Sequence, residues 1–147
     1  MNPLYLLTAL VTGAAIAVQT LANFRLRVAL GSALWGAIGQ FVVGLVLLLV
    51  LVIVARQPGP TVGGLWRMPW WGWTGGAFGA LFIVVSIVLT PRLGTALTLA
   101  SITVGQLLTA LVLDHYGWLG GTVVRLSAPR LLGAFCLLLG IALMRWK

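Results

Sequence analysis

Long apolar stretches alternate along this chain with short breaks that are polar or rich in glycine and proline. Each stretch is a continuous apolar run, which favours helices over the alternating strands of a membrane barrel. A helix needs about 20 apolar residues to cross the hydrocarbon core of a bilayer. The pattern therefore predicts an all-α membrane protein, a single transmembrane domain over residues 1–147, with five transmembrane helices at about residues 3–24, 33–55, 70–89, 93–113 and 129–144.

The breaks are expected to be loops of unequal length. Residues 56–69 and 114–128 form the longer ones, and Thr90, Pro91 and Arg92 are expected to form a very short connection. Pro129 stands where the first turn of a helix tolerates proline. The first segment has no preceding basic residue and no small-residue cleavage pattern after it, so no signal peptide is expected.

Tryptophans crowd the start of the third segment, at Trp66, Trp70, Trp71 and Trp73. A tryptophan ring is well placed at headgroup level, with its apolar part inward and its N–H in contact with water. The pattern favours an interfacial anchor, and a stacking surface for an aromatic substrate is the alternative.

Composition supports a membrane location. Of 147 residues, 61% are hydrophobic and 7% charged, whereas a soluble domain carries roughly a quarter charged residues. The net charge of +8 would indicate nucleic acid in a soluble protein. Here the basic residues stand singly between apolar segments, as they do where they flank membrane spans. Membrane lipid is therefore an expected partner, and nucleic acid is not.

Catalytic and metal-binding patterns are missing from the sequence. Cys136 lies inside an apolar run, and His115 has no second histidine or cysteine near it. No nucleophile elbow, zinc-protease motif or phosphate loop appears. We therefore expect neither a metal, a cofactor nor an enzymatic activity.

The basic residues are nearly balanced between the two sides of the membrane. With five spans, the N-terminal side carries four and the other side five, so the positive-inside rule favours neither orientation. One interpretation is dual topology, in which copies insert both ways and pair as an antiparallel homodimer; the other is a single orientation settled by further factors. The two groups are Arg56, Arg67, Arg125 and Arg130, and Arg25, Arg27, Arg92, Arg145 and Lys147.

Small residues recur at helical spacing in the third and fourth segments. In lipid, such residues allow helices to approach closely. Helix packing is therefore predicted for five glycines, namely Gly75, Gly76, Gly79, Gly94 and Gly105.

Polar side chains inside the spans are the candidate site. Gln19 and Asn23 lie one turn apart on the first helix, on the face that also carries Thr8 and Thr12. Polar groups in the hydrocarbon region face protein or a water-filled cavity. These amides therefore either form hydrogen bonds between helices or line the path of a solute.

Three further polar residues complete the candidate substrate-binding set: Gln40 on the second helix, Gln106 on the fourth, and Asp114 at the end of the fourth. Asp114 is either held by a neighbouring arginine or part of a proton-linked site. No Asp, Glu, Lys or His stands in the middle of a span, which counts against a proton-coupled exporter of cations. The alternatives are a substrate bound through neutral amides and an anion favoured by the basic surroundings.

Several motifs, in order along nearly the whole chain, resemble the YdcZ-type family of the drug/metabolite transporter superfamily. They are Gly13–Asn23, Gly75–Ala80, Pro91–Gly94, Val104–Gln106, Asp114–Gly117, and Arg130 with Gly133 and Gly140. The resemblance implies a five-helix transporter half in the bacterial inner membrane. Members of that family occur as dual-topology proteins, as oppositely oriented pairs and as fused ten-helix proteins. The plan is also similar to that of small multidrug resistance proteins, but this chain lacks their first-helix glutamate.

These observations favour a small-molecule transporter that acts by alternating access as an antiparallel homodimer. Gln19, Asn23 and Gln106 would line its central site, with Asp114 at the mouth. The alternative is a membrane assembly subunit that needs an oppositely oriented paralogue and transports nothing itself. An ion channel has less support, because the sequence shows no ring of charges or carbonyls.

Overall fold

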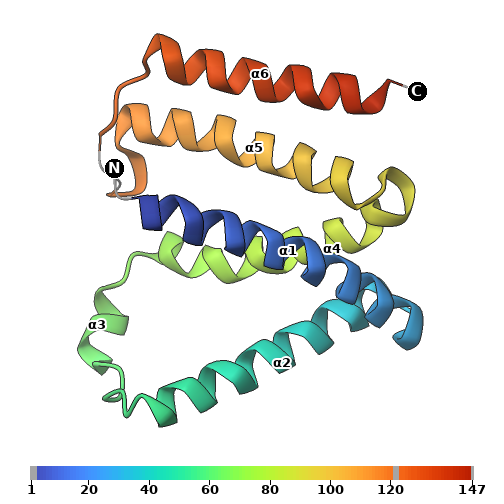
Figure 1. Cartoon of the computed structure of the whole chain (residues 1–147). Coiled ribbons are helices and arrows are strands. Elements are labelled where there is room, and N and C mark those ends of the chain that lie inside the picture. The colour runs from blue at the N-terminus through green and yellow to red at the C-terminus, as the bar shows by residue number, and fades with distance from the viewer. Residues whose placement is uncertain (1–2, 121–122, 147) are drawn as a thin grey trace. The chain divides into compact units, whose positions relative to one another are not determined.

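The computed structural model describes residues 3–120 and 123–146, and the regular elements within these ranges are helices. Five of them are long and apolar enough to cross a membrane, which confirms the prediction of an all-α protein with five spanning helices. They are α1 (Pro3–Leu30), α2 (Ala33–Val54), α4 (Thr74–Leu93) with the 3-10 turn η1 (Trp70–Trp73) before it, α5 (Thr95–Tyr116) and α6 (Ala128–Arg145) (Figure 1).

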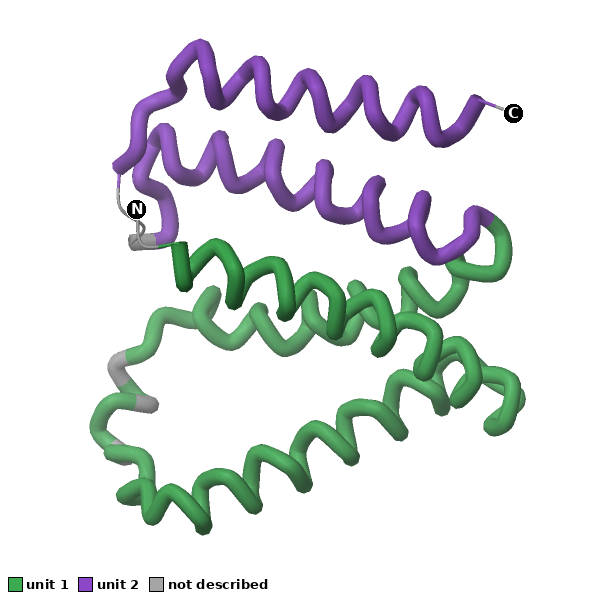
Figure 2. The backbone as a smooth tube through the Cα atoms, in the orientation of Figure 1, with its two compact units in different colours: residues 1–92 green, residues 93–147 purple. Residues whose placement is uncertain are grey.

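The chain divides into two compact units, Met1–Arg92 and Leu93–Lys147 (Figure 2). The first holds α1, α2, the short helix α3 (Val62–Arg67) and α4. The second holds α5, the 3-10 turn η2 (Trp118–Gly120) and α6. Lys147, counted above among the basic flanks, lies outside the described residues, and the extent of a single transmembrane domain over the whole chain stays a prediction.

Helix α1 continues past Phe24 to Leu30 and so includes Arg25 and Arg27. At about 1.5 Å per residue its 28 residues measure about 42 Å, more than the ~30 Å of the hydrocarbon core. Arginine is a good helix former, and its long stem carries the charge to the headgroups. The basic residues therefore extend the helix rather than end it.

The expected connection at Thr90, Pro91 and Arg92 is wrong, because α4 runs through these residues to Leu93. The turn is made by Gly94 alone, with φ 79° and ψ 158°, a conformation that is essentially restricted to glycine. The predicted loop at residues 56–69 likewise contains the short helix α3.

Helices α1 and α2 form a tight hairpin in the first unit. Gly31 turns the chain with φ 73°, and the Ser32 hydroxyl accepts a hydrogen bond from the Leu34 N–H at 3.2 Å. Gly36 is buried, and a Cβ there would lie 3.0 Å from the Arg27 backbone nitrogen. The two helices thus meet closely near the turn, where a larger residue would require the Arg27 backbone to shift.

Helix α4 packs on this hairpin through a small apolar core. Ala37 of α2 is buried with Ile83 and Ile87 of α4. Gly79 of α4 lies 4.0 Å, measured from the position of its missing Cβ, from Cζ of Phe41 on α2. These contacts hold α2 and α4 together in the first unit.

In the second unit a short loop folds back on the end of α5. The Val124 N–H donates to the Asp114 carbonyl at 2.8 Å, and the Leu126 N–H donates to Nδ1 of His115 at 3.3 Å. Helix α6 then begins with Pro129 in its first turn, as predicted. The loop therefore brings the start of α6 back beside the end of α5.

Candidate functional site

A pocket of about 650 Å³ opens between α1 and α2. It exists because the two helices touch at Gly36 and separate farther from the turn (Figure 1). The residues that line it all belong to these two helices: Gln19, Ala22, Asn23, Leu26, Gln40, Phe41, Val43, Gly44, Leu45, Leu47 and Leu48.

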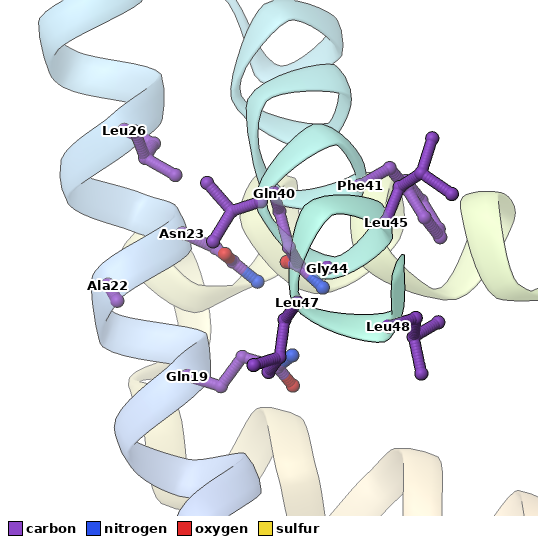
Figure 3. Close-up of a pocket in the computed structure, with 11 residues that line it drawn as sticks. Gln19, Ala22, Asn23, Leu26, Gln40, Phe41, Gly44, Leu45, Leu47 and Leu48 are labelled. Carbon is purple, nitrogen blue, oxygen red and sulfur yellow. The ribbon is translucent and has the colours of Figure 1, made fainter. Parts of the chain in front are cut away.

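Three of the predicted polar residues meet in this pocket. Gln19 and Asn23 come from α1 and Gln40 from α2, and Figure 3 shows the Asn23 and Gln40 side chains pointing toward each other. Asn23 is 3% exposed, Gln40 is half-buried and Gln19 is exposed. The three amides therefore form a polar wall of the pocket, and their burial increases from Gln19 through Gln40 to Asn23.

The side-chain oxygen of Gln40 is a buried acceptor in this wall. Oε1 is buried and has no hydrogen-bond partner among the described residues. Leaving a buried acceptor unpaired costs about 1–3 kcal/mol. A ligand that brings an N–H or O–H donor to this atom would recover that energy.

The rest of the pocket is apolar, with Leu26, Phe41 and Leu48 among its walls (Figure 3). Of the described residues that line it, none carries a charge. A full charge moved into such a place without a counterion is costly. The pocket is thus suited to an uncharged solute with an apolar body and at least one hydrogen-bond donor.

Thr8 and Thr12 do not contribute to this pocket, although they lie on the same face of α1. Both side chains are exposed, and their hydroxyls donate to carbonyls of their own helix, Thr8 to Tyr5 at 2.9 Å and Thr12 to Thr8 at 2.8 Å. The predicted row of four is reduced to Gln19 and Asn23.

The other two predicted site residues lie on α5, in the second unit. Gln106 is exposed, and a role in binding stays a prediction. Asp114 forms an ion pair with Arg130 of α6, at 3.8 Å between Oδ2 and Nη1. The arginine partner that the sequence offered as one interpretation of Asp114 is therefore present.

The glycines predicted to pack helices fall into three groups. Gly79 lies beside Phe41, and Gly94 makes the turn between α4 and α5. Gly75, Gly76 and Gly105 are exposed, and a Cβ at each would meet no described atom within 4 Å. Within this chain these three make no close approach, and packing against another chain stays a prediction.

Sequence reasoning missed Arg27 and Phe41. Arg27 donates through Nη1 to the Ile87 carbonyl at 3.2 Å. The sequence indicates that this carbonyl needs a partner, because Pro91, four residues after Ile87, has no backbone N–H to donate to it. Phe41 follows Gln40 directly and faces both the pocket and Gly79. No local pattern marks Phe41, because its neighbours come from other helices.

The described residues contain no group of three or more His, Cys, Asp or Glu side chains that could hold a metal ion. The chemistry available in the α1–α2 pocket is that of neutral amides and apolar side chains. Such groups can form hydrogen bonds and apolar contacts.

Five helices long and apolar enough to cross a membrane, with an uncharged pocket between two of them, define a helical membrane protein. The chain belongs to the family described as "Putative inner membrane exporter, YdcZ", which matches residues 4–143. That description indicates a family of membrane exporters. Searches of curated proteins and of solved structures return no match to the chain.

Proposed function

We propose that this protein exports a small uncharged solute across the bacterial inner membrane, binding it between α1 and α2. The observation that carries the proposal is the unpartnered Oε1 of Gln40, buried beside Asn23 in the wall of the pocket. A donor group on the solute pairs with this oxygen, and the apolar walls take its body. The membership of an exporter family supports the direction of transport.

The transporting unit of this proposal is an antiparallel dual-topology homodimer. An odd number of spans and a nearly balanced set of flanking charges support insertion in both orientations. Two inverted copies reproduce the inverted-repeat plan of secondary transporters, in which access alternates around one central site. The open faces at Gly75 and Gly76 offer another chain the close approach that helix association in lipid requires.

The second candidate is an assembly subunit with an oppositely oriented paralogue as partner. The same open glycine faces support it, since they fit any second chain equally well. In this case the Gln40 oxygen would accept its hydrogen bond from the partner chain, and the pocket would hold no solute.

A binding experiment separates the two functions. Purified protein is screened by thermal shift against uncharged metabolites that carry amide, hydroxyl or ring N–H groups. We expect a ligand whose dissociation constant rises at least tenfold in Gln40→Leu, a loss of about 1.4 kcal/mol, and rises similarly in Asn23→Ala. The matched control is Gln57→Leu, which removes the same amide from an exposed position and is expected to bind as the unchanged protein does. Equal binding by Gln40→Leu and the unchanged protein would contradict the assignment of the site.

Transport is then measured with the same ligand in proteoliposomes. We expect uptake or release that depends on the unchanged protein and is lost in Gln40→Leu. Binding without any movement of the ligand across the membrane would contradict export, and the absence of any binding would favour the assembly subunit.

A further inference from the structure

A second pocket, of about 380 Å³, lies between α5 and α6 of the second unit. Its polar end is the Asp114–Arg130 pair, which joins the last turn of α5 to the first turn of α6. Asp114 is the one acidic residue in the chain. The pocket therefore presents one negative and one positive charge side by side, in a protein that is otherwise strongly basic.

The ion pair is loose enough to accept further partners. At 3.8 Å it is longer than the about 2.7–2.9 Å of a charge-assisted hydrogen bond. The side chains of Arg130 and Asp114 remain 40% and 46% exposed. Each group can thus bind an opposite charge brought by a ligand.

Below the pair, the pocket is an apolar groove. It continues along α5 through Leu111 to Leu107 and along α6 through Gly133 to Leu137. Seven residues of helix correspond to about 10 Å, so the groove runs about two turns from the charged end into the span. Gly133 keeps it open, since a Cβ there would meet no described atom within 4 Å.

The depth of the charged end in the membrane is marked by aromatic rings. Tyr116, the last residue of α5, stacks on Trp118, with ring centroids 5.1 Å apart. Tyrosine and tryptophan concentrate at the membrane–water interface. The Asp114–Arg130 pair is therefore at headgroup level, and the groove leads from it toward the acyl chains.

We propose that the α5–α6 groove binds an aminophospholipid, with its ammonium on Asp114, its phosphate on Arg130 and part of an acyl chain along Gly133. An ethanolamine headgroup carries one positive and one negative charge, which matches this pair. Its ammonium has N–H donors for the carboxylate, whereas the quaternary ammonium of a choline lipid has none and a glycerol lipid has no cation at all. Arginine presents the planar donor fork that suits phosphate.

The test uses purified full-length protein in detergent, to which phosphatidylethanolamine, phosphatidylcholine or phosphatidylglycerol is added. The readouts are the thermal unfolding midpoint and the number of lipids retained in native mass spectrometry. We expect the midpoint to rise with the concentration of phosphatidylethanolamine and to rise less with the other two lipids. Equal shifts with all three lipids would overturn the proposal.

Substitutions of the charged pair test whether the preference for phosphatidylethanolamine arises in this groove. Asp114→Asn and Arg130→Gln are each expected to lose the preference for phosphatidylethanolamine. Arg125→Gln is the matched control, because it removes one arginine from the same loop region without touching the groove, and it should keep the preference. A preference unchanged in Asp114→Asn would overturn the assignment.

Gly133→Leu provides a test that leaves both charges in place. The open space at Gly133 allows the larger side chain to fit in the absence of lipid. The filled groove should exclude the acyl chain and abolish the rise in the unfolding midpoint.

Soluble glycerophosphoethanolamine tests whether the site binds the lipid or only its free headgroup. If it shifts the midpoint as strongly as the lipid does, the ligand is the free headgroup and the proposed lipid site is wrong.

Discussion

The guanidinium of Arg27 on α1 donates a hydrogen bond to the carbonyl oxygen of Ile87 on α4, at 3.2 Å. In a regular helix that oxygen would accept from the N–H of residue 91, but residue 91 is a proline inside α4. An arginine from a distant part of the sequence therefore satisfies the backbone group that the proline leaves free. The neighbouring Ser86 carbonyl receives the Thr90 hydroxyl at 2.7 Å, which supports the same turn.

This hydrogen bond predicts that the effects of substituting Arg27 and Pro91 on the free energy of unfolding are coupled. Arg27→Met is expected to destabilise the protein by about 1–3 kcal/mol, because the carbonyl is then left buried and unpaired. In a Pro91→Ala background the loss should be much smaller, since the alanine N–H can bond to Ile87. Unfolding free energies of the two single variants and the double variant give the coupling energy. A loss of the same size in both backgrounds would show that Arg27 acts in another way.

The close approach of α1 and α2 predicts that Gly36 resists substitution. In Gly36→Ala the new methyl group would lie 3.0 Å from the Arg27 backbone nitrogen, so one helix must shift. We expect a destabilisation of about 1–3 kcal/mol, typical of overpacking. Gly13→Ala is the control on α1, where a Cβ meets no described atom within 4 Å, and it should be neutral or slightly stabilising. Thermal unfolding of both variants in the same detergent measures the difference.

Gly94 is predicted to be needed for its backbone conformation rather than for packing. Space around it is open, yet its φ of 79° disfavours any residue with a Cβ. Gly94→Ala should therefore cost about 1–3 kcal/mol. Gly140→Ala, in the middle of α6 and also free of near contacts, should not. Equal stability of the two variants would contradict the assignment of strain to this turn.

The exposed Gly75 and Gly76 of α4 predict the surface through which two copies of the chain associate. Gly76→Leu fills open space in the single chain, so it should leave the fold intact and weaken self-association if that face packs against another copy. Crosslinking yield and the dimer fraction in detergent are the measurements, and Gly13→Leu is the control. A dimer fraction unchanged in Gly76→Leu would place the interface elsewhere.

The charge balance predicts that topology responds to a single residue. In a Cys136→Ala background, Gln57→Cys should react with an impermeable maleimide on about half of the copies in intact cells, as dual topology requires. Adding Arg125→Gln lowers the N-terminal side from four basic residues to three, against five. The positive-inside rule then moves that side outward, so labelling of Gln57→Cys should rise well above one half. A single orientation in both variants would exclude dual topology.

Much of the fold is predictable from the sequence because a bilayer leaves few choices. A backbone in lipid must satisfy its own hydrogen bonds, so each continuous apolar run becomes a helix, and all five spanning helices were predicted. The wrong predictions concern helix ends, at places where a polar side chain or a contact with another helix changes the local preference. Arg25 and Arg27 extend α1 instead of ending it, and Pro91 stays inside α4 because Arg27 compensates for its missing N–H.

The candidate site could be predicted only in part. Gln19 and Asn23 share a face of α1 by their spacing, and the structure adds Gln40 to them. Gln106 and Asp114 lie on α5, the fourth spanning helix, as expected, and their contribution to the same site stays a prediction. Asp114 pairs with Arg130 across two helices, and spacing along one helix cannot indicate such a pair.

The sequence by itself determined that the chain forms five helices long and apolar enough to cross a membrane, and which residues are polar within them. Hydropathy and helical spacing are local properties, and the bilayer acts on them segment by segment. Only the tertiary structure decided which polar residues share a cavity, because that depends on the Gly31 turn and the contact at Gly36, which set where α1 and α2 touch and where they separate. Gln40 meets Asn23 for that reason, with its side-chain oxygen left open to a partner from outside the chain.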